Sequence, residues 1–235
     1  MPASDKIFDP ALMPSLFRDP RMFDSVKAWD KKGFEILRKS NINLIVAKHA
    51  SMKRCLFKKY LNSRDLTEQA FRFRRRVDGA EMLRSHISSH GLKHIIVPRK
   101  WLYELPPAFS RDGQPSYILV VERLKVLDKK DSLDEYHRIK RPILRELCTI
   151  LATFKDLDFT ARNAPFTKGG AKIAFIDTEY IQRNDSSRKD QRKRYMECVE
   201  RVLSGKQRRE AEDLWREVSH EACASQSAQL EDSLR

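Results

Sequence analysis

The 235-residue sequence lacks several features that would place it at once in a familiar class. No apolar run approaches the roughly 18 residues that a membrane-spanning helix requires. The first 25 residues contain neither an apolar stretch nor a signal-like cleavage site, so a classical signal peptide is not expected. The four cysteines form no Cys-x-x-Cys pair, which favours reduced thiols in a cytosol-like compartment over a zinc site or a disulfide framework. They are Cys55, Cys148, Cys198 and Cys223.

Internal repeats are also missing, as are zinc-finger, RNP-type and homeodomain motifs, so nucleic acid is the less favoured kind of partner. The hydrophobic content of 40% is sufficient for a real core. The length fits one domain, or one domain split into two lobes around a cleft. Lys and Arg number 47 against 33 Asp and Glu, a formal charge of +14. Such a charge attracts phosphate, nucleic acid or an anionic surface.

The first half of the chain predicts an arm, a small sheet and a helix. Residues 1–33 hold four prolines, which indicates an irregular arm. Three short runs rich in β-branched, aromatic or leucine residues, separated by turn-like segments, then predict an antiparallel meander. These runs are Phe34 to Leu37, Asn43 to Lys48 and Cys55 to Leu61. From Thr67 to Ser89, apolar residues recur every three or four positions and Gly91 follows, which predicts an amphipathic helix.

The second half is predicted to be mainly helical. A strand at Ile95 to Val97, a proline-rich loop and a buried strand at Tyr117 to Val121 come first. A helix from about Leu133 to Phe154 follows, which Pro142 would kink, or whose regular part Pro142 would begin. Strands at Ala164 to Thr167 and Lys172 to Ile176 flank a glycine-containing turn, and the charged remainder from Asp185 onward has a helical pattern.

The most informative residues are Asp158, Asn163 and Asp177. Asp158 and Asn163 are five positions apart, and Asp177 ends a predicted strand fourteen residues beyond Asn163. Phosphoryl transfer uses such a set, with one carboxylate near the attacking hydroxyl and an amide oxygen plus a second carboxylate on Mg²⁺. Taken alone, the pattern is more often that of an Asp that caps a turn and an Asn that fills one.

The spacing of these three residues resembles that of the protein kinases, whose catalytic loop has Asp and Asn five apart and whose metal-binding Asp follows a hairpin. The resemblance implies that Asp158 is the catalytic base and that Asn163 and Asp177 bind the metal. It covers residues 34 to about 180 and implies ATP with Mg or Mn as cofactors. The substrate would then be a hydroxyl group of a protein or of a small molecule.

The same resemblance assigns residues to the phosphates and to adenine. Lys58, on the third predicted strand, takes the place of the lysine that contacts the ATP phosphates, and Lys48 does so in an alternative register. Glu81, in the middle of the following helix, would orient that lysine. Glu122 and Leu124, after the strand Tyr117 to Val121, would form the hinge whose backbone bonds adenine.

The implied fold is therefore α+β and two-lobed. The domains would be an arm at 1–33, an N-lobe of antiparallel strands plus one helix with the hinge at 34–124, and a reduced, mainly helical C-lobe at 125–235. Shortened kinases of this kind occur among bacterial effectors, so secretion into a host-cell cytosol is an expectation beside a cytoplasmic location.

The sequence departs from the kinase pattern in three ways. Residues 38–42 contain no glycine to approach the phosphates, Asp177 is not followed by Phe-Gly, and only 55 residues follow Tyr180. A catalytically weak pseudokinase that serves as a binding platform is therefore an alternative function. A basic adaptor for nucleic acid or an anionic membrane is another, since two basic clusters could bind an acidic protein or membrane surface. The clusters are Arg72, Arg74, Arg75, Arg76 and Arg188, Lys189, Arg192, Lys193, Arg194.

Overall fold

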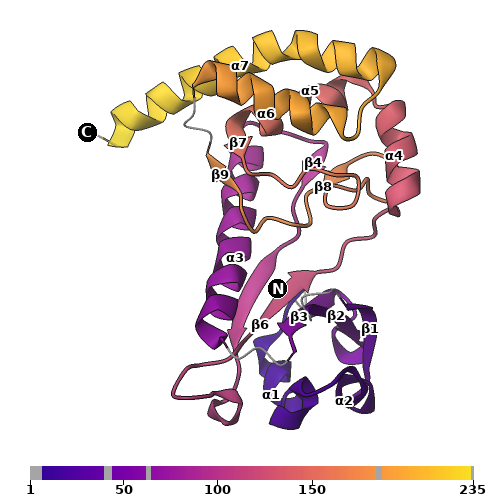
Figure 1. Ribbon diagram of the computed structural model, residues 1–235, viewed down its shortest axis with the longest axis vertical. Helices are drawn as coiled ribbons and strands as arrows, with labels where there is room; N and C mark the ends of the chain where they lie inside the picture. Colours follow the sequence, from indigo (N-terminus) through magenta and orange to yellow (C-terminus); the bar gives the residue numbers. More distant parts are fainter. Residues whose placement is uncertain (1–6, 40–43, 62–64, 184–186, 234–235) are drawn as a thin grey trace, which may run out of the picture. The chain divides into compact units, whose positions relative to one another are not determined.

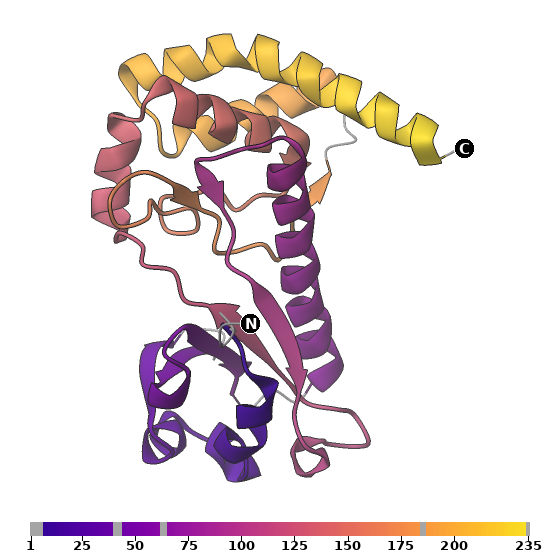
Figure 2. The same cartoon turned by 180° about the vertical axis from the view of Figure 1, so that it is seen from behind.

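The computed structural model describes residues 7–39, 44–61, 65–183 and 187–233, without the side chains of Arg188 and of residues beyond 219. The chain divides into two compact units. Unit 1 comprises Met1–Glu81 and Pro98–Leu124, and unit 2 comprises Met82–Val97 and Lys125–Arg235. Figures 1 and 2 show the helices and strands from two opposite sides. The α+β class expected from the sequence is confirmed.

Unit 1 is built on a five-stranded antiparallel sheet of order β1-β2-β3-β6-β5. Its strands are β1 (Phe34–Lys39), β2 (Leu44–His49), β3 (Cys55–Tyr60), β5 (Lys100–Glu104) and β6 (Tyr117–Glu122). The meander predicted for the first three strands is confirmed. A short 3-10 helix, η3 (Ala50–Met52), connects β2 to β3, and another, η4 (Pro107–Phe109), lies between β5 and β6.

Both faces of the central strands of this sheet are covered, whereas most residues of β1 after Phe34 are exposed. On one face, the first part of α3 (Leu66–Ser89) contributes Phe73 to a cluster with strand residues such as Leu44 and Leu119. On the opposite face, Ile45 and Phe57 pack with the chain before the sheet, residues 7–31, which is called the N-terminal segment below. Successive side chains of a strand alternate between the two faces, so neighbouring residues serve different cores.

The segment before the sheet is not the irregular arm that the sequence predicts. It forms η1 (Pro10–Leu12), α1 (Met13–Leu16), η2 (Pro20–Phe23) and α2 (Val26–Lys31). Pro10, Pro14 and Pro20 each stand at the first or second position of one of these helices, where the missing N–H would have no intrahelical partner anyway. The segment also buries Phe17 and Trp29 completely in the core of unit 1. Its prolines therefore begin short helices that are part of the core.

The strand β5 was not predicted, because the sequence around Trp101 and Tyr103 lies between two prolines and was assigned to a loop. In the structure this strand pairs with β6 from Lys100↔Val121 to Glu104↔Tyr117. Trp101 and Tyr103 are partly buried and pack against the core that contains the N-terminal segment.

The described residues of unit 2 form four more helices and four two-residue strands. They are β4 (Ile95–Ile96), α4 (Lys129–His137), α5 (Arg141–Thr153), β7 (Phe154–Lys155), β8 (Ile173–Ala174), β9 (Gln182–Arg183), α6 (Arg188–Glu200) and α7 (Gly205–Ser233). The single helix predicted from Leu133 to Phe154 is two helices, and Pro142 stands in the first turn of the second. Both views show α7 lying along α5 and α6, which it contacts (Figures 1 and 2). Among the helices described, none combines the length and apolarity needed to cross a membrane.

Candidate active site

Asp158 stands at the tip of a tight turn in unit 2. The N–H of Phe159 donates to the carbonyl oxygen of Leu157 at 2.7 Å, a three-residue γ-turn. Both neighbours are buried, and the ring of Phe159 stacks on that of Phe175 with centroids 6.1 Å apart. Asp158 itself is exposed. The apolar neighbours thus fix the turn and present the carboxylate to solvent.

Asn163 closes this loop onto Asp158. Its backbone N–H donates to the carbonyl oxygen of Thr160 at 3.0 Å, and its side-chain Nδ2 donates to Asp158 Oδ2 at 2.6 Å. The side-chain bond sets the orientation of the amide, because Nδ2 faces Asp158 and Oδ1 must face another direction. An amide oxygen oriented in this way is a suitable ligand for a hard cation.

A hydrogen-bonded hairpin connects Asn163 to the segment that ends at Asp177. Its rungs are Thr167 N to Lys172 O (2.8 Å), Ala174 N to Pro165 O (2.8 Å) and Ile176 N to Asn163 O (2.9 Å). Gly169 and Gly170 have positive φ angles of 105° and 67° at the turn, as a left-handed conformation requires. The predicted hairpin is confirmed. Its last rung places Asp177 one residue after the partner of Asn163.

Asp177 is half-buried, and its Oδ1 accepts a hydrogen bond from the N–H of Glu179 at 3.4 Å. The two residues after it, Thr178 and Glu179, are buried. The carboxylates of Asp158 and Asp177 and the amide oxygen of Asn163 make an all-oxygen donor set, which is the kind that Mg²⁺ or Mn²⁺ prefers. Over the described ranges, no group of three or more His, Cys, Asp or Glu side chains is arranged to hold a metal ion.

The two candidate phosphate lysines of unit 1 lie on neighbouring strands. Lys58 of β3 is directly opposite Val46 and Leu119, so it projects from the sheet face that α3 covers. Lys48 of β2 projects from the same face and forms a cross-strand ion pair with Glu35, with Nζ 2.8 Å from Oε2. The charge of Lys48 is therefore already compensated.

Glu81 is exposed on α3 and, among the residues the structure describes, forms no ion pair. Ala80 is 1% exposed and Leu83 fully buried, whereas Glu81 projects outward from between them. Glu81 and Lys58 are thus not joined by an ion pair.

In the expected hinge, two of three backbone donors are already used. The N–H of Glu122 donates to Arg99 O at 2.8 Å and that of Arg123 to Arg54 O at 2.7 Å. Glu122 also accepts a hydrogen bond from the Arg99 N–H through Oε2 at 3.0 Å. The N–H of Leu124 donates to no group within the described part of the chain. Residues 40–43, which belong to the expected phosphate-covering segment, are outside the described residues.

Sequence reasoning assigned no role to Lys59 or Cys198. Lys59 is only 2% exposed, and the signal for it is a pair of adjacent lysines in a strand covered on both faces, because their side chains point to opposite faces. Burial raises the pKa of Cys198 on α6; the charge of Arg201 opposes this rise, and those of Glu197 and Asp158 add to it.

No protein-family model matches the chain, and no curated protein matches its sequence. Among solved structures, one similar chain is described as WaaP in complex with acyl carrier protein. Its sequence is 16% identical, the match covers 93% of this chain and 95% of that chain, and the TM-score is 0.41. At this TM-score the similarity assigns neither a family nor a function to the chain.

Proposed function

We propose that the protein is a kinase-like phosphotransferase that uses ATP with Mg²⁺ or Mn²⁺ and acts on a hydroxyl group of a protein or small molecule. The observation that carries the proposal is the connected set in unit 2. The Asp158 carboxylate is bonded to the Asn163 amide at 2.6 Å, and the Asn163 carbonyl is bonded to the residue before Asp177 at 2.9 Å.

Each residue of this set has a role that suits its position. Asp158 is exposed and can accept the proton of an attacking hydroxyl. Asn163, oriented by its bond to Asp158, would hold the metal through Oδ1, and Asp177 would hold it through a carboxylate oxygen. The metal and ATP, when bound, supply charge neutralisation and the transferable phosphoryl group.

In unit 1, Lys58 is the proposed phosphate-binding amine. The alternative, Lys48, forms an ion pair with Glu35 across the strand pair. Glu81 would pair with Lys58 once a nucleotide is present. The Leu124 N–H is the proposed hydrogen-bond donor to adenine, because those of Glu122 and Arg123 are used within unit 1.

A pseudokinase is the second candidate function, and the exposed position of Glu81 favours it. In the kinase pattern a glutamate of this helix orients the phosphate lysine, and Glu81 does not contact Lys58 in this way here. The absence of glycine from residues 38–42 also favours a pseudokinase, since side chains keep the backbone N–H groups away from phosphate. Such a protein would bind partners, with weak nucleotide binding or none.

The decisive experiment measures label transfer from γ-labelled ATP to a mixed lysate, with Mg²⁺ and with Mn²⁺. The variants Asp158→Asn and Asp177→Asn should each lose at least about a hundredfold of the rate, because each removes a charged group used in the reaction. Asp156→Asn is the matched control, an exposed residue two positions before Asp158 at a φ of 60° that asparagine tolerates.

Transfer in the wild type and control, lost in both site variants, supports the enzyme. Nucleotide binding in a thermal-shift assay without transfer supports the pseudokinase. Equal transfer by all four proteins would reject the assigned site.

A further inference from the structure

A second basic site lies in unit 1 around Lys59. Lys58 and Lys59 are adjacent in β3, so their side chains leave the sheet on opposite faces. Lys59 is opposite Ile45, which belongs to the core shared with the N-terminal segment, and its Nζ lies 5.1 Å from the centre of the Phe23 ring. This amine therefore cannot belong to the proposed nucleotide site of Lys58.

The ammonium group of Lys59 is buried with neutral partners only. It donates to Gln69 Oε1, to Ser116 Oγ at 2.7 Å and to the carbonyl oxygen of Tyr117 at 2.8 Å. These acceptors satisfy its three N–H groups but carry no negative charge. Through the described part of the chain, no carboxylate lies within ion-pair distance of Lys59 or of Arg111. A buried cation without a counter-charge is costly, so an anion is the missing element.

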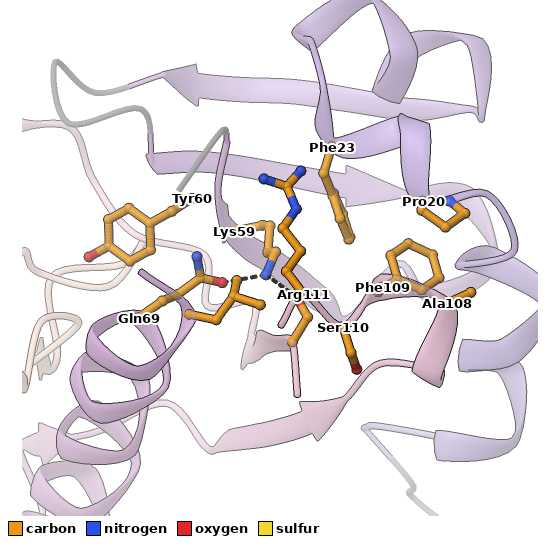
Figure 3. Close-up of a pocket in the computed structure, with 11 residues that line it drawn as sticks. Pro20, Phe23, Lys59, Tyr60, Gln69, Ala108, Phe109, Ser110 and Arg111 are labelled. Carbon is orange, nitrogen blue, oxygen red and sulfur yellow. Dashed lines mark hydrogen bonds between the residues drawn. The ribbon is translucent and has the colours of Figure 1, made fainter. Parts of the chain in front are cut away.

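A small cavity adjoins this group. Its volume is about 60 Å³, and its lining includes Lys59, Gln69, Ser116 and Arg111. Figure 3 shows Lys59 and Gln69 pointing toward each other, with the side chain of Arg111 extending beside Lys59. Because about 10–15 Å³ of such volume accommodates one water, the cavity holds roughly four oxygen-sized atoms. A tetrahedral oxyanion fits that space, whereas a sugar or a base does not.

The lining also contains an unused donor. Gln69 is 2% exposed, and its Oε1 is bonded to Lys59, so its Nε2 is the remaining polar atom. Within the described residues this Nε2 has no hydrogen-bond partner. Ser116 accepts from Lys59 and so keeps its hydroxyl proton for another acceptor. The Tyr60 hydroxyl is likewise unpartnered in the described chain, but in Figure 3 it points away from Lys59.

We propose that this cavity binds a small tetrahedral oxyanion, either free phosphate or the phosphate group of a monoester. Its oxygens accept from Gln69 Nε2 and from the Ser116 hydroxyl, and Lys59 and Arg111 compensate its charge. The exposed side chains of Pro20, Ala108 and Arg111 lie at the rim, so a ligand enters from solvent without rearrangement of the sheet. The site is independent of the proposed phosphotransfer.

Isothermal titration calorimetry of the full chain tests the proposal with three probes at constant ionic strength: inorganic phosphate, sulfate and glycerol 3-phosphate. Saturable one-to-one binding of the inorganic ions is the expected result. Similar affinity for glycerol 3-phosphate identifies a phosphate group carried on a larger molecule, and its failure to bind identifies the free ion. No saturable binding of any probe overturns the proposal.

Variants locate the site. Arg111→Gln should weaken binding about tenfold, since it removes one charge-assisted contact, and its exposed position makes the fold insensitive to the change. Arg99→Gln is the matched control for lost charge and should bind like the wild type. Lys58→Met should also bind normally, whereas Lys59→Met should not bind. Equal affinity of Arg111→Gln and Arg99→Gln would contradict the assignment.

A proton-linked readout separates binding from a purely structural role of Lys59. Burial, together with the nearby charge of Arg111, lowers the pKa of Lys59 to about 7. The groups that face its amine are Gln69, Ser116, the Tyr117 carbonyl and the Phe23 ring, none of which titrates near neutrality. An anion favours the ammonium form, so sulfate should bind with proton uptake at pH 7.5. Binding enthalpies that do not change with the buffer's ionisation enthalpy would contradict this linkage.

Discussion

The buried amine of Lys59 makes the stability of unit 1 depend on pH. Its pKa is lowered to about 7 from an ordinary value of 10.5, chiefly by burial and then by Arg111. Between pH 7 and 10.5 the unfolded chain therefore binds a proton that the folded chain does not. The contribution of Lys59 to the free energy of unfolding therefore rises with pH across that window and is constant below it.

We expect the free energy of unfolding of the wild type, minus that of Lys59→Met, to rise by up to about 1.4 kcal/mol per pH unit above pH 7. Urea unfolding followed by circular dichroism at a series of pH values measures this difference. Lys53→Met, at an exposed position in the same unit, should keep the wild-type slope. Parallel curves for the wild type and Lys59→Met would show that Lys59 keeps an ordinary pKa.

Tyr136 links helix α4 to the candidate catalytic hairpin. Its hydroxyl is fully buried and donates to the carbonyl oxygen of Ala164 at 2.5 Å, and its ring meets those of Phe159 and Phe166 edge-on. Tyr136→Phe keeps the ring contacts but leaves a buried carbonyl oxygen with one fewer donor. We expect a loss of about 1–2 kcal/mol in unfolding free energy by chemical denaturation.

The control is Tyr103→Phe, since the Tyr103 hydroxyl forms no hydrogen bond in the portion of the chain that is described. It should change stability by less than about 0.5 kcal/mol. If both variants are equally stable, the Tyr136 hydroxyl does not hold the hairpin.

Helix α4 is positioned by its first turn as well as by its buried face. Asp128 is the N-cap, and its Oδ1 accepts from the Asp131 N–H at 2.9 Å. Further along, Ser132 Oγ accepts from the N–H of Phe166 at 3.3 Å, so the helix also supports the hairpin. We expect Asp128→Ala to lower the unfolding free energy by about 1 kcal/mol.

Asp134→Ala, an exposed substitution inside the same helix, should stay within about 0.5 kcal/mol of the wild type. Both values are obtained from thermal or urea unfolding. Equal effects of the two substitutions would indicate that removal of a negative charge, and not loss of the cap, is responsible.

The sequence predicted those elements whose pattern is decided locally. The short β-branched, aromatic or leucine-rich runs of β2 and β3 and the three-to-four spacing of apolar residues in α3 are local signals, and these elements were confirmed. The N-terminal helices and β5 were missed because prolines next to a short element look like loop residues until tertiary packing is known. Met13 and Trp29 have no periodic neighbours that would reveal their burial.

The candidate site was also predicted only in part, because some of its contacts depend on tertiary packing. The hairpin between Asn163 and Asp177 follows from its glycines and its apolar strands, so the proximity of these residues could be inferred. The side-chain bond from Asn163 to Asp158 depends on the γ-turn that has Asp158 at its centre, which no sequence pattern specifies. The exposed position of Glu81 depends on the rotation of α3 about its axis, which a stripe of apolar residues fixes only to within about one position.

The basic clusters differ in how exposed their side chains are. On α3, Arg76 is buried and Arg72 is paired with Glu68 at 2.7 Å, whereas Arg75 lies over the exposed ring of Phe71. On α6, Lys189, Arg192, Lys193 and Arg194 are all exposed, although Arg192 meets Glu212. Binding of an acidic protein or anionic membrane is therefore proposed for α6 first. Steep salt dependence and insensitivity to Asp177→Asn would be its signature in vesicle-binding assays.

The formal charge of +14 should itself oppose folding, because like charges repel more strongly in the compact state than in the extended chain. Salt screens this repulsion over about 10 Å at 0.1 M, so the melting temperature should rise with sodium chloride. Sodium sulfate at equal ionic strength should raise it further, by general exclusion from the surface and by occupancy of the Lys59 cavity.

Of these two sulfate effects, only occupancy of the Lys59 cavity requires Arg111. Arg111→Gln should therefore keep the chloride response and lose part of the additional sulfate response, whereas Arg99→Gln should keep both. Identical sulfate responses in the two variants would attribute the whole sulfate effect to surface exclusion.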